Sequence, residues 1–350
     1  MSNLIEVPSE IMTKNILIDV QVDERYMEQL LSRRDLRVSF AEPIAEDEPL
    51  ERPRQLLCDA QILFCSFLPE NVSDLQNLEL VQLASSGYTQ LRGLGLAEKG
   101  VRVCNARGVF DTAIAEWNVA MMVCLARNLR GMLGNQERRI WDRAARFQTE
   151  IRGSTVGLWG YGGIARQTAR LCKALGMNVH VLVQSEVKTR QNIYAVADSG
   201  DPEGIFPDRV FTDSEREHFL SQLDFLVLCM PLTTETEGIV GVEELKTLPR
   251  RAHVLNPARG PLIQERALLQ ALDERWIAGA ALDTHYHYPL PSVHPLWALE
   301  NVILTPHISG SSGSPFFRQR VWDLFSQNID RYLAGHPLLN ELTSCQIDGC

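Results

Sequence analysis

The chain has 350 residues, of which 45% are hydrophobic and 22% charged, and its formal net charge is −10 at pH 7. This length favours two domains over one, and the composition is that of an ordinary globular protein. The negative charge disfavours nucleic acid or an anionic membrane surface as the main partner. No apolar run approaches membrane-spanning length, and residues 1–8 lack the pattern of a secretion signal. We therefore predict a cytoplasmic protein whose cysteines are reduced core thiols.

Short apolar runs alternate with amphipathic stretches between residues 15 and 105. Strands that alternate with helices predict a small parallel sheet covered on both faces. A segment rich in Pro and Glu, 41–53, is expected to be a surface loop. The strands are expected at 16–19, 37–40, 62–64, 80–84 and 101–105, and the helices at 23–33, 71–78 and 91–99.

A long apolar-periodic stretch follows the first set of strands. Asp111 or Thr112 is a candidate N-cap for a helix over 113–129. Residues 131–148, rich in Arg, predict a further helical arm that could lie against a neighbouring molecule. The apolar stripe Met121-Met122-Val123 of this helix is expected to pack in the core rather than to form a ligand surface.

A glycine turn stands between a strand and a helix in the middle of the chain. Residues 154–169 read Ser-Thr-Val-Gly-Leu-Trp-Gly-Tyr-Gly-Gly-Ile-Ala-Arg-Gln-Thr-Ala, with Gly160, Gly162 and Ala165 in the spacing G-x-G-x-x-A. The first glycine permits a tight turn, the second lets the backbone approach a diphosphate, and the alanine lets helix and strand pack closely. The N–H groups at the start of the helix favour bound phosphate. This pattern predicts a dinucleotide-binding βαβ unit.

The alternation of strands and helices continues to the end of the chain. The segment 185–224 is long for a connection between two strands, and its Gly-Asp-Pro-Glu-Gly centre predicts an inserted loop. Strands are expected at 155–159, 178–183, 224–229, 252–256, 277–282 and 301–304, and helices at 164–175 and 316–333.

Several further motifs identify the chain as similar to a known family. They are residues 106–117, 230–236, 255–263, 279–283 and 304–310, which include Asn-Pro-Ala-Arg-Gly and Thr-Pro-His-Ile-Ser-Gly. Together with the glycine turn, they resemble the D-isomer-specific 2-hydroxyacid dehydrogenases, a family that includes formate and phosphite dehydrogenases. The resemblance covers nearly the whole chain.

The resemblance implies an α/β fold with two doubly wound parallel-sheet domains. A Rossmann domain that binds NAD(P), residues 106–307, would be inserted into a smaller flavodoxin-like substrate domain made of residues 1–105 and 308–350. It also implies a homodimer formed through the cofactor domain, for which the arm at 131–148 is suited.

The family chemistry explains two matched residues that follow predicted strands. A 2-oxo acid needs its carboxylate held, its carbonyl polarised and a proton delivered as hydride arrives. The planar guanidinium of Arg259 can bind the carboxylate and the carbonyl oxygen together. The imidazole of His307 titrates near neutral pH and suits acid/base catalysis. The backbone N–H groups of Ser86 and Gly87 resemble the family's cradle for the substrate carboxylate.

The cofactor contacts are carried over in the same way, with Asp283 as the family's aspartate that orients the nicotinamide carboxamide. At the end of the second strand of this domain, NAD enzymes carry an acid for the ribose hydroxyls. Here Ser185 stands at that place, and the basic Lys188 and Arg190 follow, which favours NADP over NAD; Glu186 is an alternative, displaced acid. The predicted contacts are Gly160, Tyr161, Gly162, Gly163, Ile164, Ser185, Arg190, Pro231, Ala258 and Asp283, with no metal.

A further departure from the family pattern, besides Ser185, concerns the residue expected beside His307. The hydroxyacid dehydrogenases have a Glu just before a Pro, which raises the pKa of the catalytic His, whereas this chain has Tyr288 there. A phenol carries no charge at neutral pH, so the protonated form of His307 should lose stabilisation. Formate dehydrogenases have a neutral Gln at this place. If the segment is extended, His285 and His287 should point to one face and act as structural or rim residues.

Three functions remain open. The first is an NAD(P)-dependent dehydrogenase that acts on a small 2-oxo or 2-hydroxy acid of the glyoxylate or hydroxypyruvate kind, with Arg259, His307 and Tyr288 as catalytic residues. The second is removal of hydride from a small anion such as formate or phosphite. The third is a cofactor-binding regulator that has lost the chemistry, although retention of both Arg259 and His307 argues against it.

Overall fold

The computed structural model describes residues 13–43, 50–144 and 148–348. The expectation for residues 1–8 lies outside this part of the chain, as do the middle of the 41–53 loop and residues 145–147 of the arm. The chain divides into two compact units, of which the first comprises Met1–Val109, Asn192–Tyr194 and Gly313–Cys350 and the second the remainder. The domain boundaries expected at 105/106 and 307/308 stay a prediction. None of the described helices is both long and apolar enough to cross a membrane.

The first unit is built on a five-stranded parallel sheet in the order β2-β1-β3-β4-β5. This order is that of flavodoxin-like domains, so the predicted fold of the smaller domain is confirmed. All five strands expected from the apolar runs are present. They are β1 (Lys14–Asp19), β2 (Leu36–Phe40), β3 (Ile62–Cys65), β4 (Leu80–Leu83) and β5 (Arg102–Cys104).

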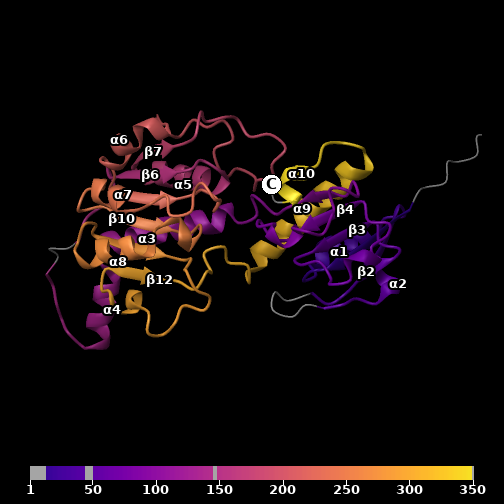
Figure 1. Cartoon of the computed structure of the whole chain (residues 1–350), viewed down its shortest axis with the longest axis horizontal. Helices are drawn as coiled ribbons and strands as arrows, with labels where there is room; N and C mark the ends of the chain where they lie inside the picture. The colour runs from indigo at the N-terminus through magenta and orange to yellow at the C-terminus, as the bar shows by residue number, and fades with distance from the viewer. Residues whose placement is uncertain (1–12, 44–49, 145–147, 349–350) are drawn as a thin grey trace, which may run out of the picture. The chain divides into compact units, whose positions relative to one another are not determined.

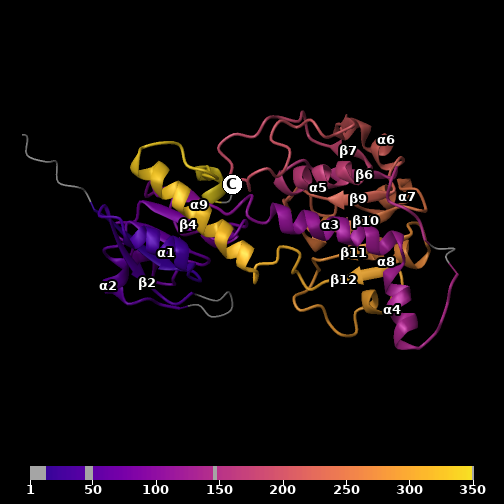
Figure 2. The same ribbon diagram turned by 180° about the vertical axis from the view of Figure 1, so that it is seen from behind.

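The C-terminal helix α9 (Pro315–Leu333) belongs to this first unit, although it follows the second unit in sequence. Its Trp322 and Phe325 are fully buried, and the ring of Phe325 stacks on Phe64 of β3 at 4.2 Å between centroids. Figures 1 and 2 both show this yellow helix beside the indigo and purple strands. Two short helices, α1 (Glu24–Leu31) and α2 (Arg54–Leu57), and the terminal α10 (Ser344–Asp348) complete the unit.

Two helices expected in the first unit are wrong. Residues 71–78 form only a short 3₁₀ turn, Val72–Asp74, which ends at Leu75, where ψ is +65° and the backbone is no longer helical. The amide of Asn71 binds the carbonyl of Arg52, which is 19 residues away in sequence, so a tertiary contact holds this segment. Residues 91–99 form a series of turns instead, since Gly93 and Gly95 adopt left-handed backbone angles that end a right-handed helix.

The second unit contains a seven-stranded parallel sheet in the order β12-β11-β10-β9-β6-β7-β8. The strand order reverses between β6 and β9, as in a Rossmann fold, which confirms the predicted class of this domain. The strands are β6 (Thr155–Trp159), β7 (Asn178–Leu182), β8 (Arg209–Phe211), β9 (Phe225–Leu228), β10 (His253–Asn256), β11 (Gly279–Leu282) and β12 (Val302–Leu304).

Helices cover both faces of this sheet, and the period-two pattern of β9 shows why. Phe225 and Val227 pack into the core beneath α3 and α5, whereas Leu226 and Leu228 pack into the core on the opposite face, beneath α6, α7 and α8. A strand buried on both faces needs a continuous apolar run, as seen here. The helices are α3 (Asp111–Ala126), α5 (Gly163–Ala174), α6 (Arg216–Leu220), α7 (Val242–Thr247) and α8 (Glu265–Asp273).

The inserted segment after β7 is more structured than the sequence predicts. It contains the edge strand β8 and helix α6, both missed because β8 has only three residues, two of them exposed, and α6 has only five. A three-residue edge strand gives too short a pattern for periodicity to detect.

The expected long helix and its arm also differ from the structure. Helix α3 ends at Ala126, because Asn128 adopts a left-handed backbone with φ +50°. Helix α4 (Leu129–Glu137) starts after this break, and residues 138–144 are not helical. The helical arm is therefore limited to α4 within the described residues.

Asp19, at the end of β1, is the most unusual buried charge of the first unit. Its side chain is 1% exposed, and within the described chain neither carboxylate oxygen has a hydrogen-bond partner. The guanidinium of Arg52 lies 3.9 Å from one of them. Burial raises the pKa of the Asp19 carboxyl to about 8, and the Arg52 charge only partly opposes this shift.

This raised pKa predicts how stability depends on pH. Between about pH 4 and pH 8 the folded state holds a proton that Asp19 of the unfolded chain has released, so the free energy of unfolding should fall as pH rises. In Asp19→Asn that decline between about pH 5 and pH 8.5 should shrink by more than about 1 kcal/mol, measured by urea denaturation. Glu24→Gln, at an exposed carboxylate, is the matched control. The same pH slope in wild type and Asp19→Asn would contradict this account.

Candidate active site

One edge of the seven-stranded sheet gathers most of the residues that the motifs single out. Parallel strands end at the same edge, so residues that follow neighbouring strands come together in space. Six consecutive strands of the sheet each contribute one such residue. In spatial order these are His307 after β12, Asp283 after β11, Arg259 after β10, Pro231 after β9, Gly160 after β6 and Ser185 after β7.

The glycine turn lies where the strand order reverses. Gly160 has φ +95°, and a Cβ there would lie 2.8 Å from the carbonyl oxygen of Cys229, so only glycine fits. Gly162 is the N-cap of α5, and a Cβ on it would meet nothing within 4 Å, which leaves open space beside the start of the helix. The buried Ala165 follows in the first turn. This arrangement fits a dinucleotide diphosphate.

Tyr161 is fixed by residues that sequence reasoning missed. Its hydroxyl donates to the carboxylate of Asp201 at 2.6 Å, and the guanidinium of Arg166 lies over its ring at 4.9 Å. Asp201 is buried and also accepts hydrogen bonds from the backbone N–H groups of Ile205 and Phe206. The inserted segment is thereby fastened to the glycine turn. Its Gly-Asp-Pro-Glu-Gly sequence predicts a loop, and no sequence pattern predicts the contact between Asp201 and Tyr161.

Of the other predicted cofactor residues, Ile164 lies in α5, and three follow strands at the same edge of the sheet. Ser185 is exposed at the end of β7, and Ile164 is half-buried in the first turn of α5. Pro231 is exposed, and its carbonyl accepts a hydrogen bond from the hydroxyl of Thr236. Ala258 is half-buried, and its N–H donates to the side-chain oxygen of Asn256.

Arg259 is exposed, and its backbone is fixed by a buried amide. The side chain of Asn256 donates to the carbonyl of Arg259 at 2.8 Å and accepts from the N–H of Ala258 at 3.1 Å. These two bonds set the turn between β10 and Arg259. The guanidinium donates to the carbonyl of Ala258 at 2.7 Å. Its remaining N–H donors give this exposed side chain the capacity to bind a planar anion.

His307 lies in a loop that the carboxylate of Asp283 organises. Asp283 is fully buried, and its two oxygens accept hydrogen bonds from the hydroxyl of Thr305 and the backbone N–H groups of Ile308 and Ser309, at 2.5 to 3.0 Å. The N–H of His307 itself donates to the backbone carbonyl of Asp283 at 2.7 Å. His307 has φ +57°, a left-handed conformation that is costly for a side chain other than glycine. These four bonds hold the exposed histidine in that conformation.

Tyr288 lies beside His307, with 5.5 Å between ring centroids and 55° between ring planes. Its side chain is 57% exposed, and its hydroxyl accepts a hydrogen bond from the N–H of His285 at 3.2 Å. The loop that carries Tyr288 is fastened elsewhere as well. The hydroxyl of Tyr286 donates to the carbonyl of Ile263 at 3.0 Å.

The expectation that His285 and His287 share one face is wrong. Residues 283–289 are not a strand, so side chains do not alternate there. His285 is buried at 6% exposure, and its Nε2 lies 2.9 Å from the carbonyl of Thr305, whereas His287 is exposed. His285 therefore joins the group of residues that hold the loop of His307, while His287 remains at the surface.

Ser86 and Gly87 lie in the first unit, after the end of β4. The hydroxyl of Ser86 donates to the carbonyl of Ala106, and the side chain of Asn105 donates to the carbonyl of Ser86 at 2.8 Å. The hydroxyl of Ser85 donates to the carbonyl of Gly87. These bonds fix the turn through its carbonyl groups. Both residues are partly exposed.

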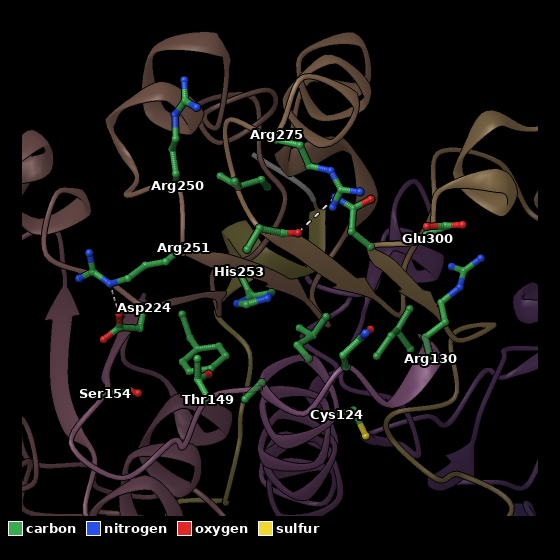
Figure 3. A pocket seen from close by; sticks show the side chains of 18 residues that line it. Cys124, Arg130, Thr149, Ser154, Asp224, Arg250, Arg251, His253, Arg275 and Glu300 are labelled. Atoms are coloured by element: carbon green, nitrogen blue, oxygen red, sulfur yellow. Dashed lines mark hydrogen bonds and ion pairs between the residues drawn. The ribbon is translucent and has the colours of Figure 1, made fainter. Parts of the chain in front are cut away.

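A pocket of about 740 Å³ lies at the opposite edge of the seven-stranded sheet, at the amino ends of the strands. Figure 3 shows His253 near its middle, Arg251 beside Asp224, and Arg130 and Arg275 near the rim. Its apolar lining comes from Leu125, Phe225, Ile277 and Ile303. This pocket is remote from the strand ends that carry Arg259 and His307. Among the described residues, no group of His, Cys, Asp and Glu side chains could hold a metal ion.

Comparisons with known proteins agree with this geometry. The family model for the D-isomer specific 2-hydroxyacid dehydrogenase, NAD binding domain, matches residues 119–309, more than half of the chain. A glyoxylate reductase from Thermofilum pendens is 31% identical over 263 residues, which cover 74% of this chain and 73% of that protein.

Two solved structures illustrate the shared fold. An NADPH-dependent glyoxylate/hydroxypyruvate reductase from Sinorhizobium meliloti, in complex with NADP and sulfate, aligns with a TM-score of 0.72 and 23% identity over 97% of this chain and 100% of that one. A D-isomer specific 2-hydroxyacid dehydrogenase from Lactobacillus delbrueckii, in its NAD complexed form, aligns with a TM-score of 0.75 and 21% identity over 95% and 100%.

The bonds to Asp283 lead to a stability prediction. In Asp283→Asn, an amide NH₂ replaces one acceptor oxygen and meets a buried N–H or hydroxyl donor of the loop. Since an unsatisfied buried group costs about 1–3 kcal/mol, the free energy of unfolding should fall by that amount in urea denaturation. Exchange of the Ile308 and Ser309 amides with solvent should also accelerate. Thr305→Val, which removes a single bond, should cost less, and wild-type exchange rates in Asp283→Asn would refute the assignment.

Proposed function

Because this chain belongs to the D-isomer specific 2-hydroxyacid dehydrogenase family, we propose that it interconverts a small 2-oxo acid and its 2-hydroxy acid, of the glyoxylate or hydroxypyruvate kind. When bound, a nicotinamide cofactor would supply or accept the hydride. The observation that carries the proposal is the single sheet edge at which Gly160, Arg259, Asp283 and His307 all lie. A nucleotide-binding turn, an anion-binding guanidinium and an imidazole are the groups that this reaction needs.

Arg259 would bind the carboxylate and carbonyl oxygens of the substrate. The side chain is exposed, and the bonds from Asn256 fix the backbone from which it extends. A guanidinium holds two oxygens through parallel N–H bonds, which orients the substrate and polarises its carbonyl. The roles of Ser86 and Gly87, which lie in the first unit, stay a prediction of the sequence resemblance.

His307 would exchange a proton with the substrate oxygen. The imidazole is exposed, and its loop is fixed by Asp283 and His285. An imidazole held in one position can protonate the oxygen that becomes the hydroxyl, or remove that proton in the reverse reaction. The resemblance predicts that Asp283 orients the nicotinamide carboxamide. Its buried carboxylate also supports a role in positioning His307.

Tyr288 keeps the formate- or phosphite-type reaction open as a second candidate. Its ring lies against His307, and a phenol does not stabilise the imidazolium as a carboxylate would. Removal of hydride from a small anion does not require a strong general acid, so a neutral neighbour is compatible with it. The regulator hypothesis has less support, because Arg259 and His307 both stand exposed on fixed backbone.

For the cofactor we propose NADP over NAD. Ser185, at the end of β7, carries no negative charge that would repel a 2′-phosphate, and Lys188 follows in the same exposed segment. Glu186 pairs with Lys188 at 3.3 Å, so its charge is partly neutralised.

We also propose a homodimer, formed through the second unit. Helix α4 and the residues after it expose several apolar side chains, and Trp141 is 89% exposed. The pocket of Figure 3 is lined by apolar side chains as well as by arginines. Exposed apolar side chains next to an apolar pocket are typical of a protein–protein interface.

The direct test is a set of steady-state assays with NADH and NADPH against 2-oxo acids, formate and phosphite. We expect turnover of a small 2-oxo acid, and in Arg259→Lys a loss of kcat/KM of about 100-fold or more, because an ammonium cannot bind two oxygens side by side. Cofactor affinity, measured by calorimetry, should stay unchanged. Arg250→Lys, in the remote pocket, is the matched control. If dinucleotide binds and no substrate turns over, the regulator hypothesis is favoured instead.

Tyr288→Glu tests the arrangement around the histidine. A carboxylate beside His307 should stabilise the imidazolium and raise its pKa, so the basic limb of the pH profile for 2-oxo acid reduction should move to higher pH by about one unit. Tyr288→Phe removes only the hydroxyl and should leave that limb in place. An unchanged profile in Tyr288→Glu would mean that the two side chains do not interact in the working enzyme.

A further inference from the structure

We propose that Arg190 binds the diphosphate shared by NAD and NADP, rather than the 2′-phosphate that distinguishes them. This inference rests on the proposed function, since it assigns a residue within the nicotinamide-cofactor site. By its place in the sequence, Arg190 would instead be expected near the 2′-phosphate of NADP. With Arg190 at the diphosphate, selection between the two cofactors would depend on other residues.

The position of the guanidinium is the main observation. A Cβ on Gly163, the first residue of α5, would lie 2.6 Å from Nη1 of Arg190 and 1.8 Å from the carboxylate of Asp111. The guanidinium therefore lies at the N-terminus of α5, next to the open space beside Gly162. Dinucleotide folds bind the diphosphate at this helix end, whereas the 2′-position lies beyond the end of the next strand.

Hydrogen bonds fix the backbone at Arg190 and at Lys188 before it. The N–H of Arg190 donates to the carbonyl of Pro202 at 3.1 Å. The buried guanidinium of Arg166 donates to the carbonyl of Lys188 at 2.5 Å and to that of Pro202 at 3.3 Å. Arg166 belongs to α5, so the segment is fastened directly to the helix whose N-terminus Arg190 reaches.

The charge of Arg190 acts on the neighbouring guanidinium of Arg166. The pKa of the Arg166 guanidinium is lowered, first by burial and also by the positive charge of Arg190. The positive end of the α5 dipole also favours a bound anion at this place. A dinucleotide diphosphate carries two negative charges and fits that requirement.

Asp111 acts as the counter-charge that positions Arg190. Its carboxylate lies 3.7 Å from Nη1 of Arg190, and the side chains are 14% and 22% exposed. That separation is longer than a hydrogen bond, so the pair orients the guanidinium without using its donors fully. A guanidinium has five N–H donors, which leaves several for phosphate oxygens.

The test is calorimetric titration of NADH and NADPH into wild type, Arg190→Gln and Lys188→Gln. Loss of a charge-assisted contact to the shared diphosphate should weaken both dinucleotides by about 10- to 100-fold in Arg190→Gln. The ratio of the two dissociation constants should stay within about twofold of the wild-type ratio, since the 2′-phosphate is not involved. Lys188→Gln is the matched control from the same segment; its side chain is 72% exposed, and NADH affinity should not change.

Other results would overturn either the role of Arg190 or the proposed function. Weaker binding of NADPH alone in Arg190→Gln would make Arg190 a 2′-phosphate ligand and overturn the proposal, as would unchanged binding of both. If wild type binds neither dinucleotide, the proposed function itself fails. Should Arg190→Gln lose its cooperative thermal unfolding, Arg190→Lys replaces it, and without the planar guanidinium it should still weaken both dinucleotides equally.

Discussion

The parallel pairing of the strands in the second unit is the constraint on which the candidate site depends. Strands β12, β11, β10, β9, β6 and β7 pair in continuous parallel register, so their carboxyl ends meet at one edge. Gly160 and His307 are nearly 150 positions apart in sequence, yet each lies close behind the end of a strand of this sheet. Each candidate residue needs only a short turn after its strand, because the sheet has already set its position.

Buried polar side chains then set those turns. The Asn256 amide fixes the turn to Arg259, and the Asp283 carboxylate fixes the loop of His307. A left-handed backbone at His307 costs of order 1–2 kcal/mol, and the bonds to Asp283 are sufficient to offset it. Both Asn256 and Asp283 are almost fully buried, so their hydrogen bonds are shielded from water and are directional. The exposed catalytic candidates thus rest on groups that solvent does not reach.

The sequence predicts these features to different extents, for physical reasons. Apolar runs buried on both faces, such as Phe225–Leu228, predict strands reliably because few other structures tolerate them. The helices expected at 71–78 and 91–99 do not form, because the non-helical backbone at Leu75 and the left-handed Gly93 and Gly95 interrupt stretches that periodicity alone would extend. The contacts of Asp201 and Asp111 could not be predicted, since they join segments far apart in the chain and no pattern marks either carboxylate.

The inserted segment shows that such long-range contacts can change the role inferred for a residue. Judged by sequence alone, Arg190 is a cation a few residues beyond the second Rossmann strand, a place that favours a 2′-phosphate. The bonds from Arg166 and the pairing with Asp111 turn the segment back towards α5, so the same charge reaches the helix N-terminus. A cation's role in a dinucleotide site therefore follows from the backbone that carries it. The number of residues between the cation and the strand predicts that role less well, because a long insertion can return to the fold wherever a buried partner holds it.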